Sequence, residues 1–109
     1  MMTDARVESG ADGELRLFGV LDYQSGPALR RAGQALIREH KGKRLLIDCS
    51  AVEKSSSVGL SLLLAFTRDA TASGQDVLIA GMPGDMREIA RVSGLLDVLS
   101  LADEPRGVV

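Results

Sequence analysis

The chain has 109 residues, of which 45% are hydrophobic and 26% are charged, and its formal net charge is −2. This length suits one domain around a single core, and the slightly acidic balance argues against nucleic-acid binding driven by a basic surface. No stretch approaches the roughly 18 uninterrupted apolar residues of a membrane span, and the polar N-terminus does not resemble a signal peptide. The single cysteine, Cys49, excludes an internal disulfide and suits a reducing compartment. We therefore expect a cytoplasmic protein without direct membrane insertion.

The first half of the chain predicts two strands followed by a helix. Residues 1–13 form a polar N-terminal segment, with a short strand expected at Arg6-Val7-Glu8. Alternating apolar residues over Glu14–Phe18, which Val20-Leu21 extend, predict a strand with one buried face. Ser25 and Pro27 are typical of a helix start, and apolar residues at helical spacing continue to His40.

The second half alternates strands and helices. Apolar runs predict strands at residues 44–48 and 76–80, and we expect both faces of these strands to be buried because the runs are continuous. Helices are expected from about Ser57 to Ser73 and from Pro83 to near Gly94. In the last apolar segment, Leu95 to Leu101, we expect a half-turn of helix followed by an edge strand at Val98-Leu99. This order indicates one α/β domain over residues 14–101 with a partly parallel sheet, and a loose tail at 102–109.

The helix predicted from Ser57 has a wide apolar face. At about 100° per residue its apolar side chains cover roughly 200° of the circumference, about twice what packing on one sheet requires. Either the rest of the fold or a binding partner covers the flank that carries Leu60 and Leu64. The apolar side chains of this face are Leu60, Leu62, Leu63, Leu64, Phe66 and Ala70.

Three consecutive serines, Ser55, Ser56 and Ser57, precede this helix, after a short polar loop that is expected to follow Asp48. Serine is a preferred helix N-cap, and the N-terminus of a helix carries the positive end of its dipole. Such a start favours anions, phosphorylated side chains or an acidic group of a partner. We therefore expect the functional surface of the chain at this position.

No arrangement of residues predicts catalysis or metal binding. The only histidine, His40, lies at a predicted helix end, and the serine run lacks the G-x-S-x-G pattern of a hydrolase nucleophile. A hydrolase that uses Ser57 would therefore lack a visible base. Asp22 and Asp48 each end a predicted strand and are expected at one edge of the sheet, where capping of loops is favoured over paired catalytic carboxylates. We expect no enzyme activity, no metal and no cofactor.

Four segments match a known family in their order and spacing: Phe18–Asp22, Leu46–Ser50, Ser55–Leu64 and Val77–Leu95. Together they resemble the STAS domain, the family of the bacterial anti-sigma factor antagonists, and the resemblance extends from about Glu14 to Leu101. It implies a single STAS domain with a four- to five-stranded mixed sheet flanked by three to four helices. It also implies a regulatory site in the loop before the second of these helices.

The start of that helix departs from the anti-sigma factor antagonists. Those proteins typically carry D-S-S-G-L there, and a partner kinase phosphorylates the serine directly before the glycine. The corresponding letters here run from Ser56 to Leu60, so Val58 occupies the phosphoacceptor position. Val58 and the run Gly59–Leu64 instead resemble the small cytoplasmic STAS subunit of the Mla-type ABC transporter, which moves phospholipids between the membranes of Gram-negative bacteria.

The second resemblance implies a non-catalytic accessory subunit, held at the inner face of the inner membrane by its complex. It implies that the chain binds the transporter's ATPase subunit, which forms a larger complex with an integral permease, and supports the assembly and activity of that complex. The residues expected to contact the partner are Ser55, Ser56, Ser57, Val58, Leu60, Ser61 and Leu64.

The alternative is an anti-sigma factor antagonist that acts by partner switching. Its partner would be a serine kinase or anti-sigma factor, and the phosphorylated residue would be Ser57 or Ser56. A phosphate there adds up to about two negative charges and so abolishes binding of the kinase.

Overall fold

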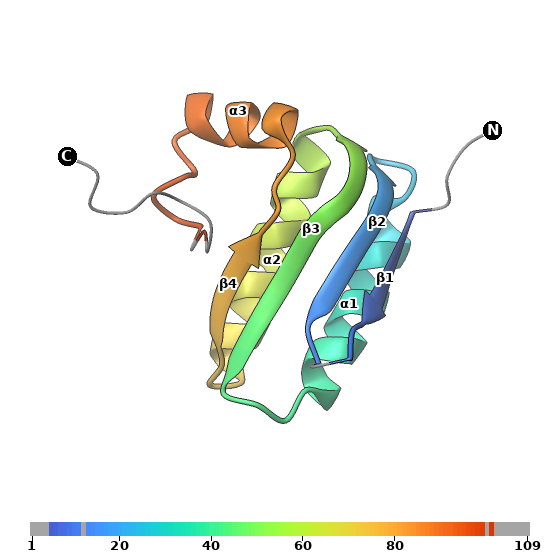
Figure 1. Ribbon diagram of the computed structural model, residues 1–109, viewed down its shortest axis with the longest axis vertical. Coiled ribbons are helices and arrows are strands. Elements are labelled where there is room, and N and C mark those ends of the chain that lie inside the picture. Colours follow the sequence, from blue (N-terminus) through green and yellow to red (C-terminus); the bar gives the residue numbers. More distant parts are fainter. Residues whose placement is uncertain (1–4, 12, 100, 102–109) are drawn as a thin grey trace.

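The structure, a computed structural model, describes residues 5–11, 13–99 and 101. They form a four-stranded sheet in the order β1-β2-β3-β4, in which β1 is antiparallel to β2 and the other neighbours are parallel (Figure 1). This confirms the predicted α/β class with a mixed sheet and three helices. The elements are β1 (Arg6–Ser9), β2 (Leu15–Leu21), α1 (Gly26–Glu39), β3 (Arg44–Ser55), α2 (Ser57–Ala72), β4 (Asp76–Ala80) and α3 (Gly84–Val92).

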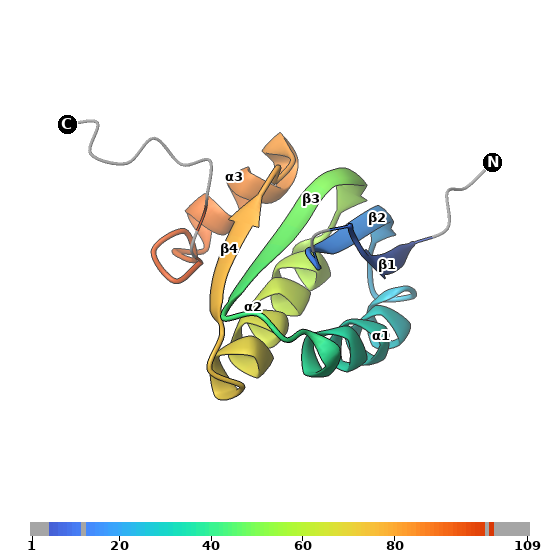
Figure 2. The same cartoon turned by 60° about the horizontal axis from the view of Figure 1, so that its bottom comes forward.

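Helices α1 and α2 cover only one face of the sheet (Figures 1 and 2). Strands β2, β3 and β4 follow one another in the sheet, so both parallel crossovers step in the same direction. Because such crossovers are right-handed in nearly all proteins, crossovers that step the same way place their helices on the same face. On the other face Leu46 and Leu78, which are neighbours in the register of β3 and β4, are 38% and 40% exposed. The expectation that these strands are buried on both faces is therefore wrong.

Strand β3 is longer than the sequence predicts. It continues past Asp48 to Ser55, where a polar loop was expected, because β2 remains paired with it as far as Leu21 opposite Ser55. The register shifts within this pairing, and Cys49 and Val52 still face the core. Asp48 consequently lies opposite Arg16, in the middle of the sheet. The expected meeting of Asp22 and Asp48 at one edge of the sheet does not occur.

The domain itself covers the apolar flank of α2. Leu60 is 2% exposed, and Leu64 is half-buried and packed against the core. On one side α1 contacts α2, and Arg30 of α1 forms an ion pair with Asp69 of α2 at 2.5 Å. On the other side α3 approaches the start of α2. The wide apolar face of α2 was expected to be covered either by the rest of the fold or by a binding partner. For Leu60, the rest of the fold provides this cover.

The segment after α3 is a turn in place of the edge strand expected at Val98-Leu99. Its contact with the sheet is a single parallel bridge between Leu101 and Ile79 of β4, while Leu99 is buried and Val98 is 58% exposed. The turn forms because backbone N–H groups of Val98 and Leu99 donate to the carbonyl of Leu95, which draws the chain away from an extended path. The tail predicted at 102–109 lies outside the described residues. Within the described ranges, no helix has the length and apolarity needed to cross a membrane.

Candidate protein-interaction surface

The start of α2 lies at the edge of the sheet where the three parallel strands end. The turns that follow β2, β3 and β4 lead into α1, α2 and α3, so the N-termini of all three helices lie toward this edge (Figure 1). The start of α2, where the functional surface is expected, therefore shares this end of the sheet with the starts of α1 and α3.

Ser55 supports the helix start from inside. Its side chain is 6% exposed, and its Oγ donates a hydrogen bond to the carbonyl oxygen of Ser56 at 2.8 Å. A β-carbon on Gly59 would lie 2.0 Å from this Oγ and 3.1 Å from the Cε atom of Met86 in α3. Only glycine fits at position 59, because the first turn of α2 passes directly over Ser55. Ser55 therefore packs beneath the surface.

Ser56 is the N-cap of α2, as the serine run predicts. Its Oγ accepts a hydrogen bond from the backbone N–H of Val58 at 3.1 Å. Its own backbone N–H donates to the carbonyl oxygen of Leu21, the last residue of β2, at 3.0 Å. The helix start is therefore held both by its own cap and by the neighbouring strand.

Ser57 is the first residue of α2 and is exposed. Among the described residues, none makes a hydrogen bond to its hydroxyl group. Ser61 and Leu64 follow at spacings of four and three residues, which places them with Ser57 on one stripe of the helix surface. Ser61 is exposed and its Oγ donates to the carbonyl oxygen of Ser57 at 3.4 Å, while Leu64 is half-buried. This stripe therefore presents the hydroxyl groups of Ser57 and Ser61 next to the apolar side chain of Leu64.

Val58 turns toward α1. A β-carbon on Gly26, the first residue of α1, would lie 3.0 Å from the Cγ1 atom of Val58, so the two helix starts are in close contact. Of the seven residues predicted to contact a partner, the structure thus exposes Ser56, Ser57 and Ser61 and half-exposes Val58 and Leu64. Ser55 and Leu60 lie within the domain.

The electrostatics of this surface favour an acidic or neutral partner. Neither α1 nor α2 has an acidic residue in its first turn, but the Asp22 carboxylate lies just before α1 and accepts the N–H of its N-cap, Ser25, at 3.0 Å. The first turn of α3 contains Asp85, whose Oδ1 accepts from the N–H of Met86 at 2.8 Å. The start of α2 is therefore the least compensated of the three helix starts.

The turn between β2 and α1 belongs to the same edge, and sequence reasoning did not assign it to the site. Ser25 was expected to cap α1 through its side chain, but its Oγ instead donates to the carbonyl of Val20 and accepts from the N–H of Asp22, both at 3.0 Å. Within this turn Tyr23 is 77% exposed. An aromatic residue between a strand and a helix start was the only signal in the sequence.

The residues that a hydrolase or metal enzyme would use are dispersed. His40 lies at the opposite end of α1, where its Nε2 is 2.7 Å from the carbonyl oxygen of Arg44. Cys49 is fully buried in β3. The described part of the chain contains no group of three or more histidine, cysteine, aspartate or glutamate residues placed to hold a metal ion.

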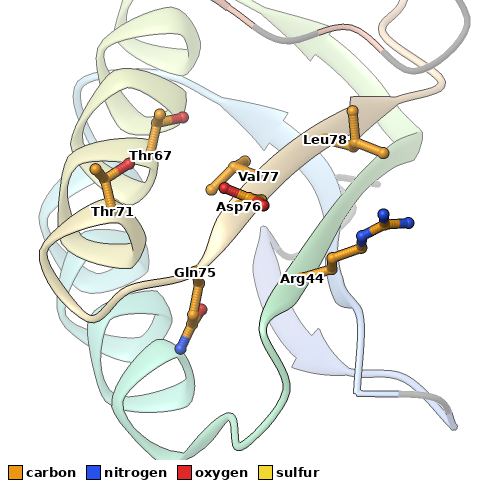
Figure 3. Close-up of a pocket in the computed structure, with 7 residues that line it drawn as sticks. All are labelled: Arg44, Thr67, Thr71, Gln75, Asp76, Val77 and Leu78. Carbon is orange, nitrogen blue, oxygen red and sulfur yellow. The ribbon is translucent and has the colours of Figure 1, made fainter.

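A shallow pocket of about 500 Å³ lies between α2 and the start of β4, away from the start of α2. Figure 3 shows Thr67 and Thr71 on the helix side of this pocket and Val77 on the strand. Its lining contains the hydroxyls of Thr67 and Thr71 and the carboxylate of Asp76, but neither histidine nor cysteine. The lining residues are Arg44, Thr67, Thr71, Gln75, Asp76, Val77 and Leu78.

Solved structures of anti-sigma factor antagonists have this fold. The chain is similar to SpoIIAA in its unphosphorylated form, with 20% identity and a TM-score of 0.69 over 93% of this chain and 90% of that chain. It is similar to an anti-sigma factor antagonist from Mycobacterium paratuberculosis, with 25% identity and a TM-score of 0.74 over 94% and 86%. The phosphorylated form of the Bacillus cell fate determinant SpoIIAA matches at 20% identity and a TM-score of 0.62 over 93% of each chain.

These similarities define the class of protein by its fold: a small α/β domain of the kind found in anti-sigma factor antagonists. Residues 5–101 also match the family described as "Mlab, STAS domain". The chain therefore belongs to the Mlab family of STAS domains, which confirms the resemblance seen in the sequence.

Proposed function

We propose that this chain is the STAS accessory subunit of a phospholipid-transporting ABC transporter. It binds the cytoplasmic ATPase subunit, which forms a complex with the integral permease, and supports assembly and activity of this complex without chemistry of its own. Membership of the Mlab STAS family over residues 5–101 is the observation that carries this proposal. The chain then works in the cytoplasm and reaches the inner membrane through its complex.

The contact surface is the exposed stripe at the start of α2. The Ser57 hydroxyl, which has no partner among the described residues, is available to hydrogen-bond across the interface. Val58 and Leu64 are half-buried and add apolar area beside it. Ser55 and Leu60, which lie inside the domain, act by fixing the position of the helix start. This arrangement resembles the apolar centre and polar rim of protein interfaces.

Affinity co-purification tests the proposal. The tagged chain is expressed at its native level in its native cell, and the proteins recovered with it are identified by mass spectrometry. We expect to recover an ABC-type ATPase and an integral permease. The recovered amounts of both proteins should fall together in a Ser57→Glu variant and should be unchanged in a Ser73→Glu variant. Ser73 is exposed at the opposite end of α2, so it is a matched serine outside the proposed surface. Recovery of a serine kinase or a sigma-system protein in place of the transporter would overturn the proposal.

Partner switching is the second candidate, because one observation favours it. The Ser57 hydroxyl is exposed at the N-terminus of a helix, where a phosphate group is stabilised by the dipole and the free N–H groups. A phosphate on Ser57 would also place about two negative charges on the contact surface. Intact-mass measurement after incubation with the co-purified kinase tests this candidate: a gain of one phosphate, lost in Ser57→Ala, supports it. An unmodified mass excludes it.

A further inference from the structure

We propose that Tyr23 is a principal contact of this surface and inserts its ring into an apolar pocket of the ATPase subunit. The proposal rests on the function proposed above and adds to it a residue outside α2. Tyr23 lies in the turn between β2 and α1 and is the most exposed large hydrophobic side chain of the described residues, at 77%.

The other two aromatic side chains of the chain are used within the domain. Phe66 is fully buried, and Phe18 is half-buried beneath the guanidinium of Arg6, whose Cζ atom is 4.0 Å from the ring centroid. Tyr23 makes no comparable ring contact with the described residues. Its ring therefore contributes little to the fold, and its removal leaves the core intact. Single exposed apolar side chains are ordinary, so the case depends on how the turn is built.

The backbone on both sides of Tyr23 is fixed by hydrogen bonds. One carboxylate oxygen of Asp22, Oδ1, accepts from the N–H groups of Gln24 and Ser25, each at 3.0 Å. The N–H of Gly26 donates to the carbonyl oxygen of Asp22 at 2.8 Å. The Ser25 hydroxyl adds the two hydrogen bonds described above, so the backbone of the turn is held by bonds between its own residues and the end of β2. A side chain held on a rigid turn binds with little loss of backbone entropy, which favours a role in recognition.

This turn and the start of α2 form one continuous surface. Leu21, two residues before Tyr23, accepts the backbone hydrogen bond of Ser56 at 3.0 Å. Gly26, three residues after Tyr23, contacts Val58 of α2. In Figures 1 and 2 the turn after β2 and the start of α2 lie at the same end of the sheet. A partner seated on Ser57 therefore meets Tyr23 as part of the same contact.

The chemistry of the turn indicates which groups a complementary pocket on the partner should contain. A tyrosine presents a flat apolar ring with a hydroxyl at its tip, and tyrosine is enriched among the residues that dominate binding energy at interfaces. The start of α2, which has no acidic residue in its first turn, belongs to the same surface and favours negative charge. We infer a pocket with apolar walls for the ring and an acidic or carbonyl-rich rim for the start of α2.

Three variants of the full chain test the role of Tyr23 against the purified ATPase subunit. Tyr23→Ala removes the ring, Tyr23→Phe removes only the hydroxyl, and Val98→Ala removes an exposed apolar side chain elsewhere. Val98 is 58% exposed and lies shortly before Leu101, which bridges to Ile79 of β4. In the sheet, β4 is two strands away from β2, after which the turn with Tyr23 follows. The dissociation constant of each variant is measured by titration calorimetry, and its melting temperature is measured to show that it folds.

We expect Tyr23→Ala to weaken binding by about 30-fold, the scale of an interface hot spot, while Tyr23→Phe stays within about fivefold of the unmodified chain. Val98→Ala should bind as the unmodified chain does. If the unmodified chain binds and Tyr23→Ala binds equally well, the role of Tyr23 is excluded and the proposed function stands. If Tyr23→Phe loses as much as Tyr23→Ala, insertion of the ring is excluded in the same way. If the unmodified chain does not bind the ATPase subunit, the proposed function fails and the role of Tyr23 fails with it.

Discussion

Gly33 of α1 sits directly on the ring of Phe66 in α2: a β-carbon at position 33 would lie 2.4 Å from the Cζ atom of Phe66. Phe66 is fully buried, so its ring has no free space into which it can withdraw. The close approach of the two helices therefore depends on the missing side chain.

Gly33→Ala should lower the free energy of unfolding. Overpacking costs about 1–3 kcal/mol, and alanine recovers about 1 kcal/mol of helix propensity, so we expect a net loss of up to about 2 kcal/mol. Urea denaturation followed by circular dichroism measures the change. Gly84→Ala is the control, because Gly84 is likewise a helical residue, at the start of α3, yet has nothing within 4 Å of its ideal β-carbon. Equal stability of the two variants would contradict this account.

Gly59→Ala should destabilise the domain through Ser55. The new methyl group would meet the Ser55 Oγ at 2.0 Å and the Met86 Cε at 3.1 Å. We expect a loss of about 1–3 kcal/mol, the usual cost of overpacking. The double variant Ser55→Ala/Gly59→Ala removes the nearer clash, so its loss should be smaller than the sum of the two single losses. Additive losses would show that the hydroxyl is not the obstacle.

Ser57→Glu should separate binding from folding. A carboxylate in the first turn of α2 interacts favourably with the helix dipole, so the melting temperature should be unchanged or slightly raised. At the proposed interface the same charge would be buried without a partner, which costs about 3–5 kcal/mol and should abolish detectable binding of the ATPase subunit. Ser57→Ala removes only one hydrogen bond and should weaken binding by about 1 kcal/mol. Full binding by Ser57→Glu would move the interface away from this residue.

The pKa of Glu88 in α3 should lie below its ordinary value. Its hydrogen bond from the Arg91 guanidinium, and secondarily the charge of that group, lowers the pKa of Glu88. The resulting stabilisation is present above the unfolded pKa of a glutamate, about 4.3, and is lost as the pH falls through the lower folded value. Because both side chains are about 60% exposed, salt should weaken the effect. A carboxyl-detected NMR titration should show the Glu88 pKa returning toward its ordinary value in Arg91→Gln; no change would exclude the pairing.

Local rules were sufficient for the helices. The serine run before Ser57 and Gly74 after α2 mark the two ends of that helix, and the observed element is Ser57–Ala72. The apolar spacing from Pro27 likewise gives α1 to within a residue at each end. These signals lie in the residues that form the caps and faces, so no knowledge of the tertiary fold is needed.

The features that the sequence did not predict depend on contacts between residues that are distant in the chain. The second half of β3 is too polar to predict as a strand, and it is held by pairing with β2, whose last residue Leu21 lies opposite Ser55. The burial of Leu60 depends on how the rest of the domain packs around α2, which helical periodicity alone leaves open. Tyr23 shows no pattern in the sequence, and its place beside α2 follows only from the bond between Ser56 and Leu21. The serine run and the resemblance to STAS domains both predicted a functional surface at the start of α2, and this stays a prediction.

One residue, Ser56, separates the end of β3 from the first residue of α2. A junction this short, bonded to β2, leaves no loop that must rearrange before a partner docks. Recognition at this edge should therefore proceed as a rigid-body encounter, with one kinetic phase and an association rate constant in the usual range of about 10⁵–10⁷ M⁻¹s⁻¹. Variants at this surface should then differ mainly in the rate at which the complex with the partner dissociates. The short junction thus predicts that such variants change the lifetime of the complex more than the rate of its formation.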